Sequence, residues 1–198
     1  VALAKDLQAN RGACAVVVGD HQPPELHALG HALNAALGNV GKTVVYTDPV
    51  EVDVTDHVAS LKALLADIDA GQVDLLVILG GNPVYNAPAD LFVAESLGKV
   101  GTRIHLSAYV DETSQICHWH LPRAHDLEAW GDARAADGTV SIVQPLIEPL
   151  YDGKSGVELM SCLLGKSGRS GYDIVRETWQ GRHPEDFEPF WRRCLHDG

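Results

Sequence analysis

The sequence lacks three features that would each identify a common class of protein. Its 198 residues include four cysteines (Cys14, Cys117, Cys162 and Cys194), and none belongs to a C-x-x-C pair, so no iron–sulfur or zinc-ribbon spacing is present. No apolar run approaches the roughly 20 residues of a membrane-spanning helix, which argues against direct membrane insertion. Lys and Arg number 15 against 27 Asp and Glu, and the net charge of −12 argues against nucleic acid or anionic lipid as a partner.

The common fingerprints of nucleotide sites and hydrolases are missing as well. Gly41-Lys42-Thr43 has the letters that end a phosphate-binding loop, but Ala36 stands where the first glycine is needed, and the motif precedes a predicted strand when it should follow one. No G-x-G-x-x-G follows the first predicted strand, and no serine or cysteine nucleophile has a local histidine partner. The sequence therefore favours neither an ordinary dinucleotide site nor a hydrolase.

Strands and helices alternate regularly over residues 1–107. Apolar runs predict strands at residues 13–18, 43–46, 73–79 and 103–106, with helices between them. Pro23 and Pro24 suit the first turn of the first of these helices, and Asp56 can cap the second. The pattern predicts the α/β class, with a three-layer, doubly wound, mostly parallel sheet of the Rossmann or flavodoxin-like kind.

After Ser107 the sequence predicts a more irregular and helical part. We expect short strands at residues 118–121 and 139–143, helices at 155–164 and 172–180, and a helical tail at 185–195 that packs on an unidentified partner. We therefore divide the chain into an α/β domain at residues 1–165 and a helical extension at 166–198. Because the chain begins at Val1 and not at Met, we expect it to be a fragment of a longer multidomain protein.

Two groups of residues are candidates for binding. Ligands of an open α/β sheet bind beyond the carboxyl ends of its strands, which predicts cofactor contacts from Gly80-Gly81-Asn82-Pro83 and from Asp48 at the end of the second strand. The alternative for each is a plain turn. Strand alternation places His118 and His120 on one face, about 7 Å apart. They are candidate metal ligands, or else half-buried histidines that bond to backbone or carboxylates.

Several short motifs together resemble the molybdopterin oxidoreductase family. The motifs are Gly81-Asn82-Pro83 after an apolar strand, Asp111-Glu112-Thr113-Ser114, Leu121-Pro122, Glu128 with Gly131, Asp137-Gly138, and upstream the turn at residues 37–41. Their order and spacing over residues 13–164 carry the resemblance. It implies the fold of the dinucleotide-binding domain of formate dehydrogenase or DMSO reductase-type enzymes.

A narrower resemblance is to the molybdopterin-oxidoreductase-like region of the large iron–sulfur subunit of alternative complex III, a quinol-oxidising respiratory complex. It rests on residues 84–90 (VYNAPAD), 117–122 (CHWHLP) and 127–134 (LEAWGDAR). The stretches at 117–120 and 135–139 depart from the residues that active family members place near the pterin. The resemblance thus implies a region without a molybdenum cofactor, and iron–sulfur clusters only in other domains of the parent protein.

Three hypotheses follow. The first is a structural domain of a respiratory electron-transfer complex that binds no cofactor, lacks a catalytic centre and contacts the parent's other domains and the membrane subunits. The second is a domain that binds molybdopterin guanine dinucleotide in an active molybdenum enzyme. The third is a free-standing nucleotide- or metal-binding module. For the first, the resemblance implies a location on the periplasmic side of a bacterial inner membrane.

Overall fold

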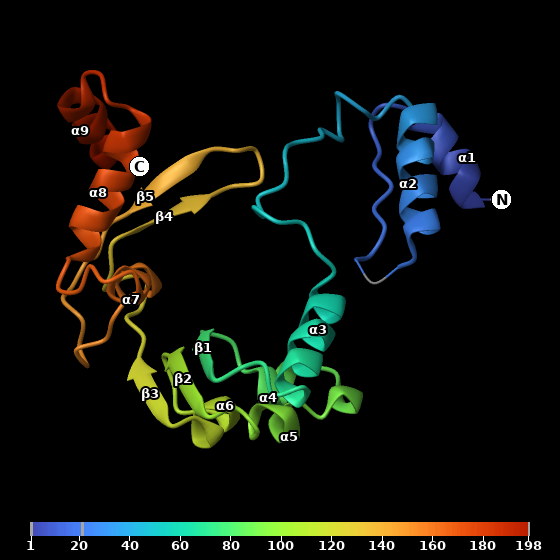
Figure 1. Cartoon of the computed structure of the whole chain (residues 1–198). Helices are drawn as coiled ribbons and strands as arrows, with labels where there is room; N and C mark the ends of the chain where they lie inside the picture. The colour runs from blue at the N-terminus through green and yellow to red at the C-terminus, as the bar shows by residue number, and fades with distance from the viewer. Residues whose placement is uncertain (1, 21, 198) are drawn as a thin grey trace. The chain divides into compact units, whose positions relative to one another are not determined.

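The computed structural model describes residues 2–20 and 22–197 and divides into two compact units (Figure 1). Unit 1 comprises Val1–Val50 with Ala136–Gly138, and unit 2 comprises Glu51–Ala135 with Thr139–Gly198. His21 lies outside the described residues. The predicted domain boundary at residue 165 stays a prediction.

Unit 1 contains the helices α1 (Ala2–Ala9) and α2 (Pro24–Ala36) joined by extended segments. Proline stands in the first turn of α2, as predicted. The predicted strands at 13–18 and 43–46 are wrong, since these segments belong to no sheet, and an isolated bridge joins Val40 to Val44. The reason is a side chain that takes the place of a neighbouring strand: the amide of Asn34 accepts from Val16 N at 2.9 Å and donates to Val16 O at 2.8 Å.

A second buried amide completes this arrangement in unit 1. Asn39 is fully buried; its Oδ1 accepts from Gly12 N at 3.1 Å and its Nδ2 donates to Asn34 Oδ1 at 3.0 Å. Gly30 lets the extended segment at residues 13–18 lie close against α2, because a Cβ at Gly30 would stand 2.6 Å from a methyl carbon of Val18. Polar side chains therefore satisfy the backbone that a sheet would otherwise pair.

Unit 2 is built on a parallel three-strand sheet, which confirms the predicted α/β class. Strands β1 (Leu75–Leu79), β2 (Thr102–Ser107) and β3 (Trp119–Pro122) lie in the order β1-β2-β3, with Leu79 paired to Leu106 and Ser107 to Pro122. The helix α3 (His57–Asp69) precedes β1. The connections between the strands hold the helices α4 (Pro83–Asn86), α5 (Val93–Leu97) and α6 (Glu112–Ile116), and a 3₁₀ turn at Ala89–Leu91.

The apolar core of this part of unit 2 consists of buried side chains on α3 and α5 and in the loop after α5 (Leu65, Ile68, Val93, Leu97 and Val100). Asp56 caps α3 as predicted, since its carboxylate accepts from Ala59 N at 2.8 Å. Of the helices predicted between the strands, the one before β2 is divided into the 3₁₀ turn and α5, because Phe92 adopts a left-handed conformation between them.

The rest of unit 2 is an antiparallel hairpin with three helices. Strands β4 (Gly131–Arg134) and β5 (Val140–Val143) are followed by α7 (Gly156–Leu163), α8 (Gly171–Arg182) and α9 (Phe187–Asp197). The partner of the predicted tail is therefore within this unit: Phe187 and Trp191 of α9 are buried with Ile142 of β5 and Val175 of α8. Over residues 2–20 and 22–197, no helix is long and apolar enough to cross a membrane.

Candidate functional site

The loop that follows β1 requires its two glycines. Gly80 and Gly81 have φ values of +73° and +70°, a left-handed conformation that favours glycine. Gly80 N donates to Leu106 O at 2.8 Å, which continues the pairing of β1 with β2 for one more residue. Pro83 then occupies the first turn of α4, with Asn82 in the cap position. The sequence therefore places the loop at the carboxyl end of the sheet, where it was predicted.

The side chain of Asn82 is bound to α6. Its Oδ1 accepts from Thr113 Oγ1 at 2.7 Å and from Thr113 N at 3.2 Å, and its Nδ2 donates to Glu112 Oε2 at 2.6 Å. Thr113 is fully buried, and its hydroxyl also accepts from Val84 N at 3.1 Å. We call this set of contacts between Asn82, Val84, Glu112 and Thr113 the clasp. It joins the loop after β1 to α6, which lies about 30 residues later in the chain.

Behind the clasp lies a buried histidine that the sequence analysis missed. His105 of β2 is fully buried; its Nε2 lies 3.0 Å from Gly81 O and its Nδ1 lies 2.9 Å from Ser114 Oγ. Asp111 approaches the same Nδ1 to 3.6 Å, and Ser114 Oγ lies 3.0 Å from His120 Nδ1. The available signal was a histidine in the middle of a predicted buried strand, because such a residue needs hydrogen-bond partners.

The carbonyl of Gly81 accepts only, so His105 carries a proton on Nε2. The hydroxyl of Ser114 lies 2.9 Å from His105 Nδ1, 3.0 Å from His120 Nδ1 and 3.3 Å from Tyr109 O. Ser114 therefore joins the two histidines to each other and to the backbone after β2.

The carboxylates beside this network have lowered pKa values. Burial raises the pKa of Asp111, but hydrogen bonds from the amide and hydroxyl of Ser114, with the nearby His105 and Ser107, outweigh it and hold the pKa below its ordinary value. The hydrogen bond from Asn82 is the largest cause of the lowered pKa of Glu112. Both groups are therefore carboxylates at neutral pH, as their roles as acceptors require.

The two histidines predicted to bind a metal have different hydrogen-bond partners. His118 precedes β3 and accepts from Arg103 N at 3.1 Å, whereas His120 lies on β3 and contacts Ser114. Among the described residues, no group of three or more His, Cys, Asp or Glu side chains could hold a metal ion. A site completed by groups outside these residues is untested, and the metal site at His118 and His120 stays a prediction.

The predicted cofactor contacts are distributed between the two units. Asp48 is an exposed residue of unit 1, and Gly80-Gly81-Asn82-Pro83 belong to unit 2. The amide of Asn82 does not fit a pterin or nucleotide contact in this arrangement, because its oxygen accepts two hydrogen bonds from Thr113 and its nitrogen donates to Glu112. The carbonyl of Gly81 is likewise bonded to His105. Cofactor binding by these residues stays a prediction.

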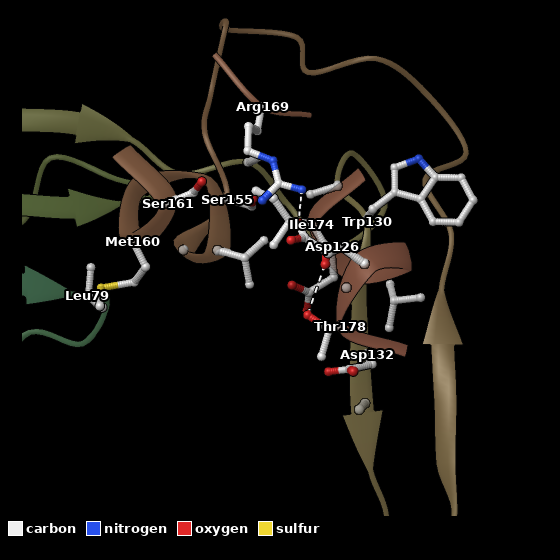
Figure 2. A pocket seen from close by; sticks show the side chains of 18 of the residues that line it. Leu79, Asp126, Trp130, Asp132, Ser155, Met160, Ser161, Arg169, Ile174 and Thr178 are labelled. Carbon is white, nitrogen blue, oxygen red and sulfur yellow. Dashed lines mark hydrogen bonds and ion pairs between the residues drawn. The ribbon is translucent and has the colours of Figure 1, made fainter. Parts of the chain in front are cut away.

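Two cavities flank the sheet within unit 2. The larger, about 850 Å³, is mostly apolar and lies between the end of β1, the β4–β5 hairpin, α7 and α8. Figure 2 shows Leu79 and Met160 on one side of it and Trp130 on the other. Arg169 pairs with Glu177 at this cavity. The second, about 440 Å³, lies at the carboxyl end of the sheet and is lined by His120, Arg123, Tyr109 and Tyr151, among others.

Comparison with known proteins supports a relationship to molybdopterin-oxidoreductase-like proteins. No family model matches the chain. The chain is similar to the menaquinone reductase, molybdopterin-binding-like subunit of Nitratidesulfovibrio vulgaris (strain Hildenborough), with 27% identity over 179 aligned residues. The alignment covers 80% of this chain and 26% of the relative, so the chain spans about a quarter of that protein's length. The similarity agrees with the broader of the two resemblances that the sequence motifs carry.

Proposed function

We propose that this chain is a structural domain of the molybdopterin-binding-like subunit of a membrane-bound quinone or quinol oxidoreductase. The similarity to a menaquinone reductase subunit supports the assignment to such a complex. Its partners would be the remaining domains of the parent protein and the other subunits, through which it would associate with the periplasmic side of the membrane. The narrower identity, the large iron–sulfur subunit of alternative complex III, rests on the motifs at residues 84–90, 117–122 and 127–134.

The clasp is the observation that supports a structural role without a cofactor. A loop that binds a nucleotide must direct free donors and acceptors toward the ligand. Here the amide of Asn82 bonds to α6, and the carbonyl of Gly81 bonds to a fully buried histidine. The loop therefore joins β1 to α6 and stabilises the sheet edge. Binding of a guanine nucleotide through the same atoms would require these bonds to be exchanged.

The test is the pterin and molybdenum content of the parent protein. The complex that contains this chain would be purified intact, and its pterin would be oxidised and measured by fluorescence while its molybdenum is measured by mass spectrometry. We expect neither above a tenth of the protein concentration, with quinone-binding membrane subunits in the same preparation. One pterin per parent chain would overturn the structural role and favour the second hypothesis.

A second measurement tests whether the histidines form a metal-binding module. Zinc would be titrated calorimetrically into the 198-residue chain and into a variant with His118→Ala and His120→Ala. The structural role predicts negligible, equal binding by both, because the two imidazoles bond to different partners. Stoichiometric binding by the parent chain that the double variant loses would favour the third hypothesis.

A further inference from the structure

We draw no further inference here: the strongest candidate, the apolar outer edge of β1 in unit 2, pairs with no further strand within residues 2–20 and 22–197, and nothing in the structure shows what covers it.

Discussion

Removal of the Asn82 side chain should destabilise unit 2 markedly, because the clasp joins β1 to α6. In Asn82→Ala, the amide and the hydroxyl of Thr113 lose their common acceptor, and Thr113 is fully buried. Leaving a buried donor without a partner costs roughly 1–3 kcal/mol. Because Asn82 itself is only half-buried and water can reach the vacated space, we expect the free energy of unfolding to fall by about 2–3 kcal/mol. The exposed Glu112 is not counted.

The measurement is urea unfolding of the chain, monitored by circular dichroism and by tryptophan fluorescence. With a denaturant slope of about 2 kcal/mol per molar for a protein of this size, the midpoint should fall by about 1 M. Asn86→Ala is the matched control: Asn86 lies one turn later in α4, is exposed, and forms no side-chain hydrogen bond within the described residues. The free energy of unfolding of this variant should change by less than about 0.5 kcal/mol.

A double-mutant cycle separates the clasp from a general loss of packing. Thr113→Val removes the hydroxyl that donates to Asn82, and the double variant Asn82→Ala with Thr113→Val should then be more stable than the two single effects imply, by about 1 kcal/mol. If Asn82→Ala behaves like Asn86→Ala and the coupling is close to zero, the clasp does not stabilise the fold. The amide of Asn82 would then be available for a ligand, against the structural role.

Three further outcomes follow from the buried polar groups. Asp111→Ala should lower the free energy of unfolding by about 1–2 kcal/mol at pH 7, because the carboxylate caps α6. Because folding lowers the pKa of Asp111, its carboxylate should stabilise the fold at pH values above its unfolded pKa, and this stabilisation should disappear as the pH falls through its folded pKa. The free energy of unfolding of the Asp111→Ala variant should therefore depend less steeply on pH in the acid range. Iodoacetamide should modify the exposed Cys162 before Cys117 at pH 8, because burial raises the pKa of Cys117; mass spectrometry of the peptides would detect the reverse order. Asn39→Ala should speed hydrogen exchange at residues 12–16 of unit 1 by ten-fold or more, and unchanged exchange would show that the buried amide does not hold that segment.

The fold of unit 2 could be predicted where hydropathy and local chemistry agree. The most apolar run became β1, the cap residue Asp56 began α3, and the glycine pair ended the strand. Each of these features depends on residues close together in the sequence. The class of the sheet followed, because a helix between two neighbouring strands supplies the long crossover that parallel pairing needs.

The same reasoning failed in unit 1, where an apolar run is neither buried nor paired in a sheet, and Val17 is 88% exposed. Residues 13–18 are as apolar as a strand, and they do run extended, but the backbone of Val16 bonds to the amide of Asn34 on α2. A hydropathy pattern shows that a segment is apolar, and here it does not show that the segment is removed from water. It does not identify which group satisfies the backbone.

The sequence predicted the position of the candidate site but not the hydrogen-bond partners of its residues. The loop at Gly80–Pro83 lies at the predicted sheet edge, yet the partners of Asn82 are about 30 residues later in the chain. Parallel pairing of β2 with β1 and with β3 brings them together. His105 looked like an ordinary strand residue. Its role depends on complete burial between Gly81 and Ser114, which local sequence does not encode.

The buried histidine explains why the loop after β1 would resist rearrangement around a ligand. His105 is fully buried and bonds to this loop through Nε2 and to α6 through Ser114, so a change at the Gly81 carbonyl leaves a buried nitrogen without its acceptor. Rearrangement of that loop around a ligand would leave at least one buried group unsatisfied, at a cost of roughly 1–3 kcal/mol.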